Sequence, residues 1–214
     1  GDVAHNIIDV KGIEQAVDAR KPLLWYSLYD YFYEALLAVA QMQDFYLQHG
    51  AGFHMTDPVE IWQSYCDDFY KMDGYYMSFY QQYRNVKQST YNELDDLFKQ
   101  AAEVVDNLYN NWYLANLTQN WTNAAGKQLA ETGYIEGIEQ QTDFYEKHVA
   151  QATSRTFVII SDAMRYEVAE SLSRELEQEM QGSVSLTACQ GIFPTVTHFG
   201  MAALLPHKEL SVEA

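Results

Sequence analysis

Two short stretches of the sequence carry the side chains that could do chemistry. In the first, FVIISDAMRYE at residues 157–167, four apolar residues run directly into Ser161 and Asp162. A short β-branched run of this kind predicts a buried parallel strand, and ligands of open α/β sheets gather at the carboxyl ends of such strands. A carboxylate there suits a divalent metal ion, because such ions prefer oxygen ligands. The alternative is that Asp162 caps the helix that follows, since aspartate is common at helix N-caps.

The second stretch is GIFPTVTHFGMAALL at residues 191–205, in which Thr195 and Thr197 stand where an extended chain turns into a helix. A hydroxyl at this place can simply cap the helix. The same place also stabilises anions, because free backbone N–H groups and the helix dipole point toward them. A threonine that attacks a phosphoryl group needs such surroundings and a metal ion that lowers the pKa of its hydroxyl.

Two charged neighbours of these positions have both a functional and a structural interpretation. Arg165 has the geometry to bind a phosphate, but a surface ion pair with the helix carboxylate of Glu167 is the simpler interpretation. His198 directly follows Thr197 and could assist proton transfer, or it could be a solvated residue at the start of a helix.

The elements that must position these residues follow one another as strand, helix, strand and helix. TFVIIS predicts the first strand. MRYEVAESLSRELEQEM predicts a helix with Val168, Leu172 and Leu176 on one face, which ends by Gly182. SVSLTACQGIF predicts a second strand or an extended connection, and a last helix begins near Thr197. This order is typical of the start of an α/β sheet.

Residues 1–150 have a different pattern, that of long amphipathic helices separated by short breaks. The expected helices cover residues 23–50, a segment that opens at the Asp57-Pro58 cap, a segment that opens at the Thr90 and Glu93 capping box, and about 135–150. Short breaks between such helices favour an antiparallel bundle. Its Tyr and Trp stripes are expected in the core, although their polar tips could face a partner protein.

Composition excludes several classes of protein. The formal net charge is −17, so the chain lacks the basic footprint of a protein that binds nucleic acid. Apolar runs fall far short of a membrane span, and no signal-peptide pattern opens the chain. Its two cysteines, Cys66 and Cys189, lie far apart and fit a reducing, cytoplasmic location. We expect an excised piece of a longer protein, since the last helix is not followed by a closing strand.

The motifs FVIISDAMRYEVAESL and GIFPTVTHFGMAALLPH together resemble the PglZ family of the type 1 BREX phage-defence systems. The family pattern has an apolar strand, SDALRYEVA, and a Pro-x-x-Thr segment that leads into GMAALLP; Met164 stands here for the leucine. The upstream stretches IWQSYCDDFYKMDGYY, LYNNWYLANLTQNW and QTDFYEKHV are also similar to that family. The resemblance therefore covers most of the chain.

The resemblance implies a domain of the alkaline phosphatase superfamily with a two-metal phosphohydrolase site, usually of zinc. It assigns metal binding to Asp162 and the nucleophile to Thr197, which also contacts the metal, with Thr195 as the alternative. Arg165 is a weaker candidate for substrate binding. Because further Asp and His ligands are expected beyond Ala214, this chain alone is expected to be inactive and to bind no metal.

The expected fold is a mainly α-helical bundle over residues 1–150, followed over residues 155–214 by the incomplete start of an alkaline-phosphatase-like α/β domain. The first functional hypothesis is a metal-dependent phosphoesterase acting on a phosphate ester. The second is a non-catalytic scaffold whose helices bind other BREX proteins. A helical-repeat adaptor is a third possibility, but the sequence shows no fixed period.

Overall fold

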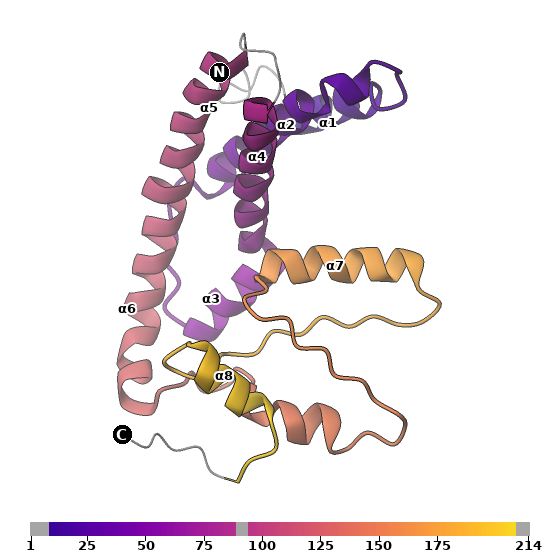
Figure 1. Cartoon of the computed structure of the whole chain (residues 1–214). Helices are drawn as coiled ribbons and strands as arrows, with labels where there is room; N and C mark the ends of the chain where they lie inside the picture. Colours follow the sequence, from indigo (N-terminus) through magenta and orange to yellow (C-terminus); the bar gives the residue numbers. More distant parts are fainter. Residues whose placement is uncertain (1–8, 89–93, 209–214) are drawn as a thin grey trace. The chain divides into compact units, whose positions relative to one another are not determined.

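The computed structural model of the protein describes residues 9–88 and 94–208 (Figure 1). The elements are α1 (Val10–Asp18), η1 (Tyr26–Leu28), α2 (Asp30–His49), α3 (Pro58–Ser64), η2 (Tyr65–Phe69), α4 (Tyr70–Gln88), α5 (Asp95–Asp106), η4 (Asn107–Leu114), α6 (Ala115–Thr132), η5 (Gln141–Asp143), η6 (Tyr145–Val149), α7 (Tyr166–Glu179) and α8 (Thr197–Leu204). The mainly helical fold is thus confirmed. The capping box expected at Thr90 and Glu93 lies outside the described residues.

The chain folds as two compact units that interleave along the sequence. The first comprises Gly1–His54 and Asp68–Asn120, and the second comprises Met55–Asp67 and Trp121–Ala214. Within the described ranges, no helix combines the length and the apolar character that a membrane span requires.

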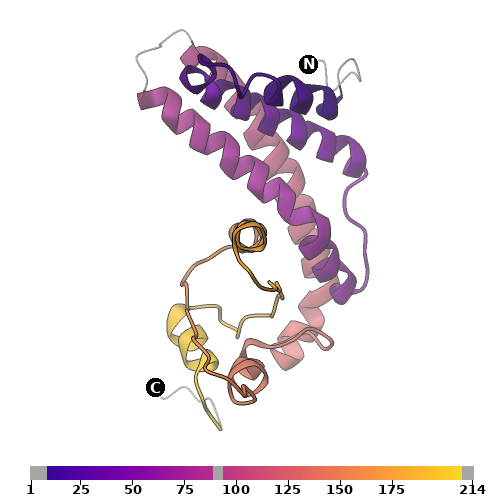
Figure 2. The same cartoon turned by 90° about the vertical axis from the view of Figure 1, so that its right-hand side faces the viewer.

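The first unit is built around α2, α4 and α5, which pack against one another, with α1 alongside α2 (Figure 2). Helix α2 begins at Asp30, later than residue 23, because turns and the short helix η1 precede it. The core of this first unit consists largely of aromatic and small side chains. Among them are Tyr31, Ala35, Ala38, Met42, Phe45, Phe79, Phe98, Val105 and Tyr113.

A buried carboxylate ties the aromatic core of this unit together. Asp73 is 3 % exposed, and its Oδ1 atom accepts a hydrogen bond of 2.5 Å from the hydroxyl of Tyr109. The hydroxyl of Tyr113 donates to the carbonyl oxygen of Phe69 at 2.9 Å and lies 3.2 Å from Asp73 Oδ2. Each buried polar group of this network therefore has a partner, which removes the large cost of burying it unpaired.

The second unit opens with the predicted helix cap. The side chain of Asp57 accepts a hydrogen bond from the backbone N–H of Val59 at 2.9 Å, and Pro58 occupies the first turn of α3. This cap is therefore confirmed. Farther along the chain, Ala125, Ile135 and Ile138 form a small buried cluster. The side chains that pack against this cluster are Val59, Trp62, Trp121 and Leu129.

The continuous helix predicted over residues 135–150 is wrong. Gly133 and Gly137 have positive φ angles of 78° and 88°, a backbone region that glycine enters without steric cost. They turn the chain twice, and helical structure resumes only at η5 and η6. The physical reason is that burying Ile135 and Ile138 requires a turn at this point, and the two glycines permit it.

The two predicted strands are extended segments without a ladder in the described part of the chain. Residues 156–161 are all exposed, and Ile159 is 92 % accessible to solvent. An isolated parallel bridge joins Gln140 to Gln190, near the end of the second segment. The prediction of two strands is therefore corrected. A parallel strand needs neighbours on its edges, and the described residues supply none for residues 156–161.

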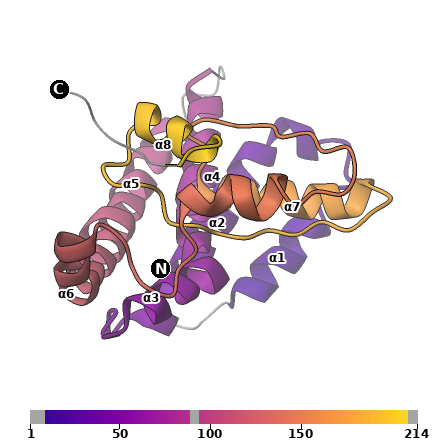
Figure 3. The ribbon, with the colours of Figure 1, turned by 90° about the horizontal axis from the view of Figure 1, so that it is seen from below.

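The order of the elements around α7 is nevertheless that of a strand–helix–strand unit. In Figures 1 and 3 the extended chain before α7 and the one after it run in the same direction, and α7 runs back between them. A cavity of about 350 Å³ is lined by Val158 to Ser161 on one segment and by Thr187 and Cys189 on the other. Val168 and Leu172 of α7 are 50 % and 41 % exposed, so the predicted apolar face is only partly covered.

Candidate functional site

Asp162 lies directly after the extended segment 156–161, in an exposed turn. The next residue, Ala163, has a φ angle of 58°, a left-handed conformation that costs a residue with a Cβ atom about 1–2 kcal/mol. Helix α7 begins only at Tyr166, and its N-cap is Arg165, without a side-chain cap. The structural alternative for Asp162, that it caps this helix, is therefore wrong in the structure. Its carboxylate remains available for another role.

Thr197 is the first residue of α8, as the sequence indicated for the start of this helix. The N-cap is Val196, which forms no side-chain cap, so neither Thr195 nor Thr197 caps the helix. The first backbone N–H groups of a helix have no partner within the helix, and the positive end of the dipole lies there. The hydroxyl of Thr197 therefore lies at a place that favours a negatively charged group.

The structure brings the two main candidates together. The Oγ1 atom of Thr197 lies 3.5 Å from Oδ2 of Asp162, although the two residues are 35 positions apart in the sequence. At this distance a hydrogen bond between the two groups is weak, and both side chains are exposed. A carboxylate and a hydroxyl held this close can contribute to the same site.

These residues supply only some of the ligands that the metal implied by the resemblance would need. Carboxylate and hydroxyl oxygens are chemically suitable ligands, so Asp162 and Thr197 fit one edge of such a site. Over residues 9–88 and 94–208, however, no group of three or more His, Cys, Asp and Glu side chains could hold a metal ion. Further ligands would have to come from other parts of a longer chain.

Arg165 forms an ion pair with Glu167, the structural alternative predicted for it. The Nε atom lies 2.5 Å from Oε1 of Glu167, whose side chain is only 6 % exposed. The guanidinium side chain itself is 49 % exposed. This ion pair uses the Nε atom, which carries one of the five N–H donors of a guanidinium group.

Thr195 and His198, the remaining sequence candidates, are both exposed beside Thr197. The lining of the cavity beside the extended segment 156–161 includes Ser161, His148, Glu139 and Cys189. His148 Nε2 lies 3.0 Å from Glu139 Oε1. Partial burial, and secondarily the charge of Glu139, raises the pKa of the Cys189 thiol, although the residue as a whole is exposed.

Sequence reasoning missed the two glutamines that hold the second stretch in place. The Nε2 atom of Gln141 donates to the carbonyl oxygen of Gly200 in α8, and its Oε1 atom accepts from the N–H of Ile192. Gln190, which is 8 % exposed, donates to the carbonyl oxygens of Ile135 and Ile138 and accepts from the N–H of Ile135. No pattern in the sequence distinguishes these side chains from exposed glutamines.

The start of α7 is fixed in a similar way within the same unit. The hydroxyl of Tyr166 donates to the carbonyl oxygen of Cys66 at 3.2 Å, and its ring lies 5.9 Å from that of Tyr65. Because Tyr166 follows Asp162 by four residues, this contact anchors one end of the turn that carries the carboxylate.

Comparisons with known proteins agree with the motifs. Residues 143–214 match the family of the BREX system PglZ alkaline phosphatase-like domain. The alkaline phosphatase-like protein PglZ of Bacillus cereus (strain H3081.97) is 32 % identical over 96 % of this chain. The alkaline phosphatase-like protein BrxZ of Escherichia coli O9:H4 (strain HS) is 30 % identical over 95 % of it.

The resemblance to PglZ proteins is confirmed by these matches and extends over nearly the whole chain. The chain spans 24 % of the length of each of these two relatives. No solved structure matches it.

Proposed function

From its similarity to PglZ proteins, we propose that this chain is part of a bacteriophage-defence protein whose complete form is a metal-dependent phosphoesterase. In this proposal residues 1–150 are a helical domain, and residues 155–214 are the first portion of the alkaline-phosphatase-like domain. The supporting observation is the distance of 3.5 Å between Thr197 Oγ1 and Asp162 Oδ2. These are the two residues that the family motifs assign to the nucleophile and to metal binding.

In the proposed reaction Thr197 is the nucleophile. Its Oγ1 atom forms a bond to the phosphorus of a phosphate ester, while the bond to the ester oxygen breaks and the alcohol leaves with a proton. Water then attacks the phosphothreonine; phosphate is released from a monoester or the remaining monoester from a diester, and a proton of the water restores the hydroxyl. A divalent metal, zinc by analogy with the superfamily, would lower the pKa of the hydroxyl when bound. Asp162 would hold it on one side, and the N-terminus of α8 would favour the phosphoryl oxygens.

Arg165 would support the same reaction as a phosphate-binding residue. Its ion pair with Glu167 limits the freedom of the side chain, so less conformational entropy is lost when the guanidinium binds an oxyanion. Because ligands are lacking in the described chain, we propose that this chain alone has no turnover. The unpaired thiols of Cys66 and Cys189 are compatible with a cytoplasmic location.

The test is hydrolysis of bis(4-nitrophenyl) phosphate by the longer protein, with zinc and with a chelator. Thr197→Ala and Asp162→Ala should each lower turnover by about 100-fold or more, which corresponds to a barrier roughly 3 kcal/mol higher. Thr195→Ala is the matched control, because it removes an exposed hydroxyl two residues away and should leave most of the activity. Full activity in Thr197→Ala would disprove the assignment of the nucleophile.

A second candidate function is a scaffold, in which the helical part binds other proteins of the defence system. The supporting observation is that the described helices expose an apolar groove, whereas the two candidate catalytic residues do not form a complete site. If the longer protein lacks turnover although it is folded and supplied with metal, this function is favoured. Co-purification of the 214-residue chain with proteins encoded beside it would support it directly.

A further inference from the structure

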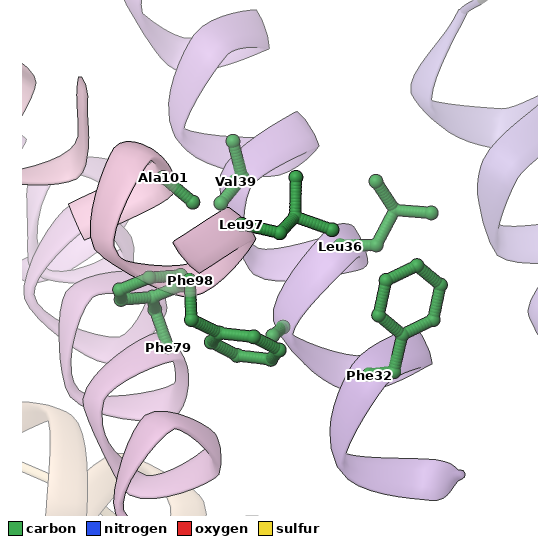
Figure 4. Close-up of a pocket in the computed structure, with 8 residues that line it drawn as sticks. Phe32, Leu36, Val39, Phe79, Leu97, Phe98 and Ala101 are labelled. Carbon is green, nitrogen blue, oxygen red and sulfur yellow. The ribbon is translucent and has the colours of Figure 1, made fainter. Parts of the chain in front are cut away.

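We propose that the groove between α2 and α5 binds a basic amphipathic helix of another protein. The groove has a volume of about 140 Å³, and only apolar surface lines it (Figure 4). For comparison, an apolar cavity of about 150 Å³ holds one benzene molecule. The groove therefore has room for one large apolar side chain. This inference develops the scaffold function and does not depend on phosphoesterase activity.

Two stripes of apolar side chains form the walls of the groove. On α2 they are Phe32, Leu36 and Val39, and on α5 they are Leu97 and Ala101. Successive members are separated by three or four residues, so each stripe follows one helix face. A groove with a helical stripe on each side is suited to a third helix that presents apolar residues at the same spacing.

The floor of the groove is buried and closely packed, whereas its walls are exposed to solvent. Phe79 and Phe98 are 1 % and 3 % exposed, and their rings stack at a centroid distance of 6.0 Å. By contrast, Leu36 and Leu97 are 45 % and 49 % exposed, and Val104, one turn beyond Ala101 on α5, is 48 % exposed. Large apolar side chains left half exposed beside a packed floor gain stability when another surface covers them.

Charge indicates which kind of helix fits. Of the seven carboxylates on α2 and α5, Glu34 and Asp106 accept hydrogen bonds from tyrosine hydroxyls, and Lys99 is the one Lys or Arg residue of these two helices. Asp96 and Glu103 are exposed and lie seven residues apart, beside the stripe of Leu97. Lys99 is already paired with Asp95 and Asp96. A helix with Lys or Arg along its flanks would complement this rim, which gives specificity and a fast approach.

The same charges argue against one other occupant. A second copy of this chain also carries a net charge of −17, so the two copies would repel each other. Because the proposed scaffold function consists of binding other proteins, the favoured occupant is a helix of a different polypeptide.

The test uses a fluorescent peptide of about four helical turns, with leucines at i, i+4 and i+7 and lysines elsewhere. Its binding to the 214-residue chain is followed by fluorescence anisotropy. Leu97→Asp should weaken binding at least tenfold, and Leu24→Asp, a fully exposed leucine outside the groove, should change it less than twofold. The same peptide with glutamate in place of lysine should bind at least tenfold more weakly.

Ala101→Trp is the second variant, because it fills the groove while adding apolar surface. It should also weaken binding at least tenfold, which distinguishes the groove from general hydrophobic adhesion. Equal effects of Leu24→Asp and Leu97→Asp, tight binding to Ala101→Trp, or no binding of the lysine peptide would overturn the proposal. Thr197→Ala should bind the peptide normally, so loss of the phosphoesterase proposal leaves this one intact.

A photo-crosslinking residue placed at Leu97 in the longer protein, expressed in its own host, identifies the occupant. Crosslinking to a basic amphipathic segment of another polypeptide, lost when Ala101→Trp is added, supports the proposal. Crosslinking to a second copy, or to another segment of the same polypeptide, overturns it.

Discussion

Similar apolar side chains are buried in the first, helical unit and exposed in the extended segments around α7. In the helical unit Phe79 and Tyr113 are buried, and the carboxylate of Asp73 is enclosed by tyrosine hydroxyls. Around α7 the run Phe157 to Ile160 is just as apolar, but Phe157 and Ile159 are 74 % and 92 % exposed. The reason is that a helix forms its backbone hydrogen bonds within itself, whereas a strand depends on residues elsewhere in the chain.

The largest loss of stability is expected from Asp73→Ala in the helical unit. The substitution removes the buried carboxylate that accepts from Tyr109 and lies against Tyr113, so the free energy of unfolding should fall by about 3 kcal/mol. Urea denaturation followed by far-UV circular dichroism measures it. Asp96→Ala removes a carboxylate that is 87 % exposed and should change stability by less than about 0.5 kcal/mol. Equal losses in both variants would show that the buried network adds nothing.

A smaller loss is expected from Gln190→Ala in the second unit. Its amide satisfies one N–H and two carbonyl groups of residues 135–138, so its removal should cost about 2 kcal/mol. Hydrogen exchange should become faster at the amide of Ile135. The exposed Gln181→Ala is the control, and unchanged exchange at Ile135 in Gln190→Ala would contradict the structure.

A weaker effect should appear at alkaline pH in the helical unit. Burial, followed by the hydrogen bond that the hydroxyl of Tyr80 donates to Asp106 at 2.8 Å, raises the pKa of Tyr80. Because the folded pKa exceeds the unfolded value of about 10, this contribution to stability is complete below about pH 10 and is lost as the pH rises above it.

Urea denaturation curves at pH values from about 8 to about 11, on both sides of the unfolded pKa, measure how the free energy of unfolding changes. Tyr80→Phe should make the fall above pH 10 shallower. Tyr134→Phe, at a 40 % exposed tyrosine of the second unit, is the control. An identical pH dependence of Tyr80→Phe and the unmodified chain would contradict the prediction.

The smallest effect is expected from Ile159→Ser in the 214-residue chain. At 92 % exposure the side chain contributes little, so stability should change by less than about 0.5 kcal/mol. Ile135→Ala, at a side chain that is 1 % exposed, should cost about 3 kcal/mol. If the longer protein places further strands beside residues 156–161, Ile159→Ser should lower its melting temperature clearly. A large loss of stability in the 214-residue chain would contradict the exposed position of Ile159.

The parts of the fold that sequence predicted are those with local signals. The Asp57-Pro58 cap, the helix that begins at Tyr166 and the helix that begins at Thr197 each follow from a few neighbouring residues. The two predicted strands do not form in the described residues, because strand pairing depends on distant segments. The break at Gly137 was missed since a glycine is compatible with both a turn and a tolerated helix position.

The sequence predicted the two main residues of the candidate site, but not the side chains that hold the surrounding segments in place. Asp162 and Thr197 came from motif positions, and the structure places them side by side. Gln141 and Gln190 were not predictable, because they act by hydrogen bonds to backbone groups up to 59 residues away. Nothing in residue type or spacing marks a glutamine for such a contact. The catalytic roles of Asp162 and Thr197 stay predictions.

The exposed run from Phe157 to Ile160 has a consequence for the synthesis of the protein. If the strands that cover this run in a longer chain are translated after it, they leave the ribosome later. At about 5–20 residues per second, each further 100 residues takes roughly 5–20 s. During that time a β-branched segment of low charge is open to pairing with other nascent chains. The order of translation therefore makes chaperone binding at this segment advantageous.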